Sequence, residues 1–232
     1  MQIMNKNLDI ISRIPLFNGL PDDQLKEVAQ IAVDRYFSKG EGVFSEGDDG
    51  NGFFVVVEGL VKIYKVSTEG KEQILHILGP GEPFGEVPVF SGQSFPASAE
   101  AIAESHLLYF ARAAFVGLIS GNPSLSLNML AVLSMRLRQF TVQIENLSLK
   151  EVPGRLAAYL IYMAEEQGKE DTVTLGISKG QLASILGTIP ETLSRIFSKM
   201  TAQGLIEVNG ADIRLLNLSG LGELAEHGKH TE

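Results

Sequence analysis

The spacing of hydrophobic and polar positions divides this chain into three stretches. Between about residues 36 and 110, short β-branched and aromatic runs such as Phe53-Phe54-Val55-Val56-Val57 alternate with glycines. This pattern predicts many short strands joined by tight turns, and therefore a β-sandwich or β-roll that can hold one small ligand. Before it, residues 22–33 have the spacing of an amphipathic helix, which follows a turn at residues 16–21.

A long helix is predicted to begin at Asn122-Pro123 and to end at about Leu149. Its apolar residues repeat with spacings of 3, 4, 3, 4 and 3, at Leu130, Leu133, Leu137, Phe140, Ile144 and Leu147. This a/d heptad spacing predicts a two-stranded coiled coil, and hence a homodimer. The alternative is that the helix packs on its own domain.

Two short helices are predicted near the C-terminus. Ser178 suits the N-cap of the first, which ends near Leu186, because its hydroxyl can accept an orphan backbone N–H. Gly187 allows the turn between the helices, and Pro190 suits the first position of the second. The second helix has one apolar stripe that faces a core, formed by Leu193, Ile196, Phe197 and Met200.

A β-hairpin is predicted directly after Gly204, which ends the second helix. Residues 205–208 and 213–215 are β-prone, and Asn209-Gly210 between them is a strong hairpin signal. Two helices followed by such a hairpin form a winged helix-turn-helix. The segment therefore predicts double-stranded DNA as the partner.

The outward face of the second helix has the chemistry needed to read base pairs. Arg195 can fork onto guanine O6 and N7, and Glu191 can accept a hydrogen bond from the cytosine amino group. The predicted DNA-contacting residues are Ser178, Lys179, Glu191, Thr192, Ser194, Arg195 and Lys199. The alternative is an ordinary surface pair between Glu191 and Arg195, which lie one helical turn apart.

Composition narrows the function further. The 232 residues carry a net charge of −9, yet in the two predicted helices Lys179, Arg195 and Lys199 outnumber Glu191. This local basic patch suits sequence-specific binding rather than a nonspecific nucleic-acid coat. The sequence has no cysteine, which excludes disulfides, thiolate zinc sites and cysteine-ligated iron–sulfur clusters. Because neither a signal-peptide pattern nor a membrane-length apolar run is present, we expect a cytoplasmic protein without a membrane partner.

The expected fold class is α+β, in four parts. Residues 1–121 form a β-roll that binds an effector, and residues 122–150 form a dimerisation helix. Residues 151–220 form the winged helix-turn-helix, joined through a hinge near Pro153-Gly154, and residues 221–232 form a polar tail.

This order of elements resembles the CRP/FNR family of bacterial transcription regulators over essentially the whole chain. Residues 84–90 and 96–99 resemble the family's effector-pocket segment, and Glu191-Thr192-Leu193-Ser194-Arg195 resembles its recognition helix. The resemblance implies a cyclic-nucleotide-binding-like roll, a homodimer on a palindromic operator, and contact with RNA polymerase. It also implies an effector pocket at Gly85, Glu86, Val87, Pro88, Phe95, Pro96, Ala97 and Ser98.

Departures from the family pattern change the expected effector. Cyclic-AMP binders carry an Arg-Ser pair where this chain has Pro96-Ala97, and a buried phosphate without its cation is costly. The absence of cysteine also excludes the oxygen-sensing cluster of the FNR branch. We therefore expect either haem or a small organic molecule in an apolar-rimmed pocket. His76 and His106 are candidate haem ligands, and the alternative for both is an ordinary structural role.

Two other classes of function stay open. Gly176-Ile177-Ser178-Lys179-Gly180 matches the nucleophile motif of serine hydrolases, but the only later histidines, His227 and His230, lie in the expected tail. An N-cap role explains Ser178 more simply. The second alternative is a ligand-binding roll that controls a protein partner. The favoured interpretation is an effector-gated, sequence-specific DNA-binding regulator that is not an enzyme.

Overall fold

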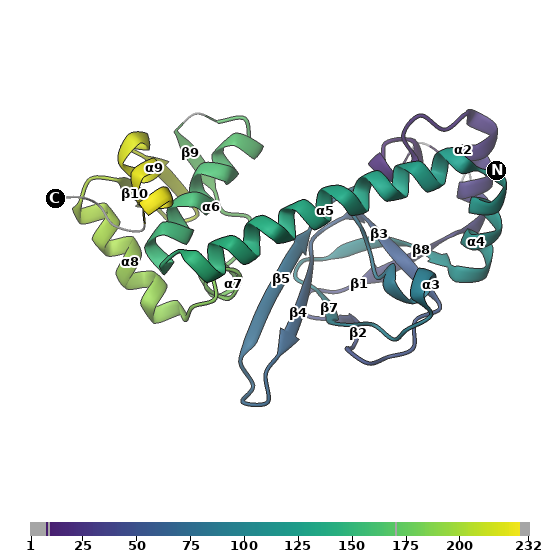
Figure 1. Ribbon diagram of the computed structural model, residues 1–232, viewed down its shortest axis with the longest axis horizontal. Coiled ribbons are helices and arrows are strands. Elements are labelled where there is room, and N and C mark those ends of the chain that lie inside the picture. The colour runs from purple at the N-terminus through teal and green to yellow at the C-terminus, as the bar shows by residue number, and fades with distance from the viewer. Residues whose placement is uncertain (1–7, 9, 170, 228–232) are drawn as a thin grey trace. The chain divides into compact units, whose positions relative to one another are not determined.

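The computed structural model describes residues 8, 10–169 and 171–227, and the chain divides into two compact units. The first unit spans Met1–Leu137 and the second spans Arg138–Glu232. Figure 1 labels most of their elements. One long helix, α5 (Pro123–Leu149), contributes residues to both units.

The first unit is built on two four-stranded antiparallel sheets. One sheet has the order β1-β8-β3-β6 and the other has the order β2-β7-β4-β5. The strands are β1 (Ala32–Phe37), β2 (Gly42–Phe44), β3 (Gly52–Glu58), β4 (Val61–Val66), β5 (Glu72–Leu78), β6 (Pro83–Phe84), β7 (Ser98–Ala101) and β8 (Ser105–Ala111).

Helices cover one face of the first sheet, and the second sheet packs on its other face. The helices of this unit are η1 (Pro15–Phe17), α2 (Asp22–Ile31), α3 (Val87–Ser91), α4 (Arg112–Gly121) and the start of α5. Residues 53–57 of β3 are all apolar because both faces of this strand are buried. Phe53 and Val55 join the core shared with the helices, whereas Val56 lies in the core between the sheets. Because side chains alternate along a strand, a strand buried on both faces has no polar positions.

The predicted α+β fold with an N-terminal β-roll is confirmed. The boundary of the first predicted helix was wrong by two residues, because Ala32 and Val33 pair with Phe110 and Tyr109 of β8 and open β1 instead. Tertiary pairing overrides the helical spacing at these two positions.

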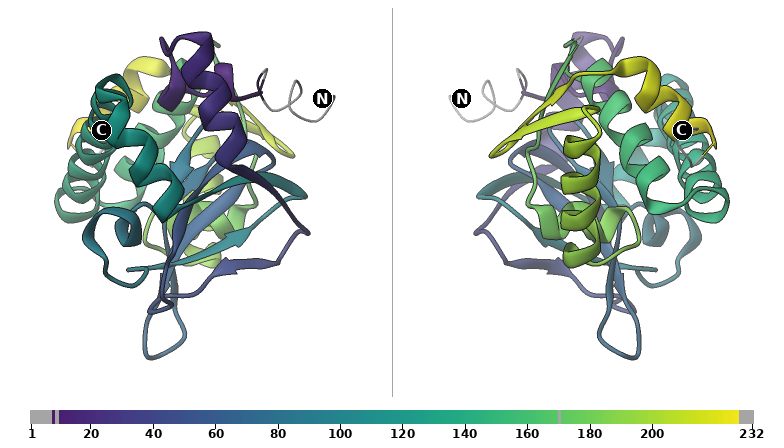
Figure 2. Two further views of the ribbon diagram at one scale, coloured as in Figure 1. Left: turned by 90° about the vertical axis from the view of Figure 1, so that its right-hand side faces the viewer. Right: turned by 90° about the vertical axis from the view of Figure 1, so that its left-hand side faces the viewer.

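The second unit combines helices with a small three-stranded sheet of order β10-β11-β9. Its elements after α5 are α6 (Val152–Glu166), β9 (Thr172–Thr174), α7 (Lys179–Ile185), α8 (Pro190–Ala202), β10 (Ile206–Asn209), β11 (Asp212–Leu215) and α9 (Leu218–His227). Figure 2 shows them in the green-to-yellow part of the chain. One continuous apolar core joins α6, α7, α8, α9 and the sheet.

Local chemistry explains the predicted helix-turn-helix, which forms as expected. The Ser178 hydroxyl accepts from the Gln181 amide, and the Gln181 side chain accepts from the Ser178 amide, a reciprocal capping box for α7. Gly187 has φ +65°, a left-handed conformation that favours glycine in the turn before α8. Pro190 occupies the first turn of α8, where its missing N–H costs nothing.

Two expectations for this unit were wrong. Pro153 and Gly154 lie inside α6 rather than at a hinge, because proline is tolerated in a first helical turn, and the break after α5 falls at residues 150–151. The expected polar tail is helix up to residue 227, and its Leu221, Leu224 and Ala225 join the core of the unit. These three positions have helical spacing, which the expectation overlooked. His230 lies outside the described residues.

Within the described part of the chain, no single helix is long and apolar enough to cross a membrane; α4 and α5 pass that test only as a pair, which is bent by 115°.

Candidate nucleic-acid interface and effector site

Helix α8 separates its buried and exposed faces as the sequence predicted. Leu193, Phe197 and Met200 are buried in the core of the unit, and Ile196 packs against it. The opposite face exposes Glu191, Ser194, Arg195, Ser198 and Lys199, with Thr192 half-buried beside them. All predicted contact residues of this helix therefore lie on one side that is accessible to a partner.

The Arg195 guanidinium is available for base reading. Its Nε lies 3.4 Å from the backbone carbonyl oxygen of Glu191, a weak contact, and no ion pair joins the two side chains among the described residues. The simple surface pair that was the alternative for these residues is therefore not formed. An exposed guanidinium can donate two parallel hydrogen bonds to guanine, which is bidentate binding.

Helix α7 places two further predicted residues at its beginning. Ser178 is exposed and uses its oxygen as an acceptor in the cap, so its hydroxyl proton stays available for a phosphate oxygen. The Lys179 Nζ lies 5.4 Å from the centre of the Phe197 ring, a cation–π arrangement that ties α7 to α8.

The hairpin supplies one cation that the sequence prediction did not include. Strands β10 and β11 pair from Ile206 with Leu215 to Asn209 with Asp212. Arg214 is exposed on β11, 4.0 Å from both Asp171 and Glu207, and ion pairs at that distance hold a side chain only weakly. The alternation of Ile213, Arg214 and Leu215 was the signal that this side chain faces outward.

The heptad positions of α5 split into two rows. Leu130, Leu137 and Ile144 are 59%, 69% and 64% exposed, which is unusual for residues of this type. Leu133, Phe140 and Leu147 are half-buried, and Leu133 packs against the core of the first unit. The helix thus exposes one apolar row along its length, while Leu133 of the neighbouring row packs within the first unit.

The predicted effector segment carries a buried ion pair. Glu86 is nearly fully buried, and its Oε1 accepts from Nη1 of Arg136 at 2.9 Å. Nη2 of Arg136 donates to the backbone oxygen of Pro83 at 2.7 Å. Arg136 comes from α5 and was missed as a site residue, because only the fold brings it to Glu86 across fifty positions of sequence.

The apolar rim expected around this segment is closed by packing. Pro88 and Val89 of α3 are buried, and so are Phe95 and Ala97, while Val87 is exposed. Phe95 stacks on Phe44 with ring centres 3.7 Å apart. Phe44 in turn contacts Phe54 and Phe84, so aromatic rings fill the space between the sheets here.

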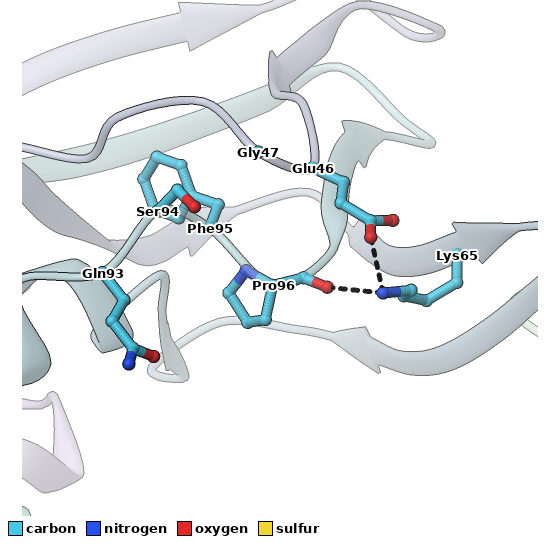
Figure 3. A pocket seen from close by; sticks show the side chains of 7 residues that line it. All are labelled: Glu46, Gly47, Lys65, Gln93, Ser94, Phe95 and Pro96. Atoms are coloured by element: carbon cyan, nitrogen blue, oxygen red, sulfur yellow. Dashed lines mark hydrogen bonds and ion pairs between the residues drawn. The ribbon is translucent and has the colours of Figure 1, made fainter.

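An open hollow of about 520 Å³ lies on the outer side of the same segment, and its walls are polar (Figure 3). Its lining residues are Glu46, Gly47, Lys65, Gln93, Ser94, Phe95 and Pro96. The Lys65 Nζ donates to Glu46 at 2.6 Å and to the Pro96 carbonyl at 3.0 Å. Ser98 lies beside it and accepts from the Glu46 amide. Of the predicted pocket residues, only Phe95 and Pro96 line this hollow.

Both candidate haem ligands are engaged in side-chain contacts. His106 Nε2 lies 2.7 Å from Asp34 Oδ1, and the Tyr36 ring stacks on the imidazole. His76 Nε2 lies 3.4 Å from Glu82 Oε1. Burial raises the pKa of Glu82, but hydrogen bonds from His76 and the Gly79 amide outweigh burial and leave that pKa lowered. The described residues form no cluster of three or more metal-ligating side chains.

The serine motif places Ser178 at the N-cap of α7. The Ser178 oxygen accepts from the Gln181 amide in the capping box, which is the N-cap role that the sequence predicted. His76 and His106 belong to the first unit, whereas Ser178 belongs to the second.

Comparison with known proteins assigns both units to families. The profile described as cyclic nucleotide-binding domain matches residues 34–122, and the Crp-like helix-turn-helix domain matches residues 154–224. The nitrogen fixation regulation protein FixK of Bradyrhizobium diazoefficiens is 32% identical, covering 90% of this chain and 88% of that protein. A CRP-like cAMP-activated global transcriptional regulator of Mycobacterium tuberculosis is 27% identical, covering 94% and 99% of the two chains.

A solved structure has a similar fold over most of the chain. FixK2 from Bradyrhizobium japonicum is 26% identical and superposes with a TM-score of 0.74 over 84% of this chain and 97% of that chain. The likeness therefore includes both units and the helix that they share.

Proposed function

The chain belongs to the CRP/FNR family of transcription regulators, with a cyclic-nucleotide-binding-type domain followed by a DNA-binding helix-turn-helix, and we propose that it is a homodimeric, effector-gated regulator that binds a palindromic operator. The observation that carries the proposal is the exposed face of α8. Glu191, Ser194 and Arg195 project from a helix that is anchored on its opposite side, which is the arrangement a recognition helix requires. We also propose that the protein is not an enzyme, acts in the cytoplasm and contacts RNA polymerase.

The open apolar row of α5 supports a homodimer. A second copy of Leu130, Leu137 and Ile144 would cover the first across a two-fold axis, as in a two-stranded coiled coil. Two recognition helices would then read half-sites about 34 Å apart on one face of the DNA.

The proposed effector is a small organic molecule other than a cyclic nucleotide. A buried phosphate needs a cation, and the two cations near the segment already have carboxylate partners, Arg136 with Glu86 and Lys65 with Glu46. Haem is less favoured, because Nε2 of each candidate ligand already contacts a carboxylate, Asp34 at His106 and Glu82 at His76.

Gating would pass through the ion pair between the roll and α5. An effector near Glu86 changes how Arg136 is held, and Arg136 lies on the helix that carries the open apolar row. The effector must bind the DNA-competent arrangement more tightly than the other arrangement, since equal affinity for both shifts nothing.

Selection from random-sequence DNA tests the proposal directly. Purified protein should enrich one palindrome, and calorimetry should detect no binding of cyclic AMP at micromolar concentrations. Enrichment of no sequence would contradict the DNA-binding proposal, and micromolar cyclic-AMP binding would contradict the effector class. An esterase assay on the protein and on Ser178→Ala tests the enzyme alternative. Turnover by the unaltered protein that is lost in the variant would favour that alternative.

A further inference from the structure

The Phe95 side chain lies inside the roll, in a position formed by Phe44 and the surrounding backbone. The residue is only 6% exposed, although the neighbouring Gln93, Ser94 and Pro96 line the outer hollow in Figure 3. One face of its ring lies on Phe44 at 3.7 Å, with the two planes only 7° apart. Aromatic pairs more often stack offset or edge to face, with ring centres about 4.5–7 Å apart, so this close, nearly face-to-face stack is not their preferred geometry.

The backbone around Phe95 is fixed from both sides. Its N–H donates to the Asp48 carbonyl at 3.0 Å, and its carbonyl accepts from the Gly47 amide at 2.9 Å. The next carbonyl, that of Pro96, accepts from Lys65. The chain therefore directs this ring inward by a framework of hydrogen bonds rather than by apolar packing alone.

Gly50 and Gly85 leave room for the Phe95 ring, because a Cβ at either position would crowd it. A Cβ at Gly85 would press on both Phe44 and Phe95 at 3.2 Å, and a Cβ at Gly50 would overlap Phe95 at 2.8 Å and Pro88 more severely. Gly85 also has φ +76°, so its conformation as well as its size favours glycine. The ring thus lies against backbone on one side and against Phe44 on the other.

We propose that Phe44, Gly50 and Gly85 bound a subsite for an aromatic ring, and that Phe95 fills this subsite. A flat, uncharged aromatic molecule binds in the subsite when Phe95 is removed or displaced. The walls of the subsite are aromatic carbon and glycine backbone, and Glu86, which follows Gly85 in the chain, is already paired with Arg136. Such walls suit an uncharged ring and disfavour an anion.

The subsite is connected to α5 by direct contacts within the first unit. Phe95 and Pro88 meet over Gly50, and Pro88 belongs to α3, whose N-cap is Glu86. Glu86 in turn holds Arg136 of α5. Filling or emptying the subsite would therefore move α3 and the ion pair together. This regulatory consequence rests on the proposed function, whereas the subsite itself does not.

Indole is a suitable probe, because it is flat, aromatic and uncharged. Phe95→Ala should bind one indole per chain by calorimetry, and indole at ten times its Kd should lower the unfolding constant of the variant about 11-fold. The unaltered protein should bind indole at least about tenfold more weakly, because Phe95 is displaced in only a small fraction of molecules. Phe44→Ala combined with Phe95→Ala should lose the site.

Phe90→Ala is the matched control, since Phe90 lies on the same short helix α3 and is exposed. It should behave like the unaltered protein. If Phe95→Ala does not fold, Phe95→Val removes the ring with less loss of packing and enters the same titration. No saturable indole binding by a folded Phe95 variant would overturn the subsite and leave the DNA-binding proposal unaffected. Indole binding that leaves operator affinity of the variant unchanged would overturn the connection to α5.

Discussion

The winged helix-turn-helix and the β-roll use their charged side chains in opposite ways. On α8, Arg195 and Lys199 face solvent, and the described residues show no carboxylate paired with either. In the roll, Arg136 and Lys65 are already bound to Glu86 and Glu46. The DNA-binding surface can therefore accept an anionic partner without rearrangement, whereas an anionic ligand of the roll would have to displace Glu86 or Glu46 from these cations. Under the proposed function, the β-roll is therefore the region whose existing contacts an effector would change.

The largest expected effect concerns the open row of α5. Ile144→Asp places two carboxylates in the proposed dimer seam, which should cost about 3–5 kcal/mol of dimerisation free energy, the usual cost of an uncompensated buried charge. Sedimentation should then show a monomer. Met135 is 61% exposed and lies about 140° around the helix from Leu130, so Met135→Asp is the control and should stay dimeric. A dimeric Ile144→Asp variant would place the interface elsewhere.

The next prediction tests whether the cores of the two units unfold independently. Leu193→Ala should destabilise the second unit by about 2–5 kcal/mol, because Leu193 is fully buried there and leaves a cavity. Hydrogen exchange should show faster opening of α6 to α9 and unchanged protection in β3 and β8. Phe53→Ala is the converse variant for the roll. Equal loss of protection in both units from either variant would show that the cores unfold together.

Base reading by Arg195 gives a smaller effect. Arg195→Ala should weaken binding to the selected operator by about 1–3 kcal/mol and relax the preference at one base pair. Lys199→Ala, one turn further along α8, should weaken binding to all sequences alike, because a phosphate contact carries no sequence information. Equal loss on all sequences from Arg195→Ala would remove that residue from the readout.

The smallest effect concerns acid stability of the roll. Since the pKa of Glu82 is lowered in the folded protein, its contribution to stability is present above the ordinary value of 4.5 and is lost as pH falls through the folded pKa. Glu82→Gln should therefore reduce the drop in urea midpoint between about pH 5 and 3. Glu69→Gln, at an exposed carboxylate in the β4–β5 turn, is the control. An unchanged drop in Glu82→Gln would assign the acid sensitivity to other groups.

The helix-turn-helix and its hairpin were predictable because their signals are local. Ser178 caps within three residues, Pro190 begins a helix where it stands, and the buried face of α8 follows from 3.6-residue spacing. Asn209-Gly210 likewise fixes the turn that it occupies. Each inference needed only neighbouring residues, and each is confirmed by the fold of the second unit.

The interior of the roll was not predictable, because its contacts are long-range. Arg136 reaches Glu86 only through the path of α5, and Phe95 reaches Phe44 only because the loop before β7 lies beside the end of β2. The sequence pattern marked the segment around Gly85 as apolar but could not distinguish an open apolar pocket from one filled by the chain. The residues that line the open hollow, such as Glu46 and Lys65, come from strand ends with no shared motif.

The central claim is that two recognition helices bind one DNA duplex as a pair with fixed spacing. The most direct measurement compares binding to the selected palindrome with binding to the same palindrome carrying five extra base pairs between its half-sites. The insertion rotates one half-site by about half a turn, so it should lower affinity to near the nonspecific level, about 10³-fold or more. Unchanged affinity would mean that single recognition helices bind independently, and would contradict the dimeric account.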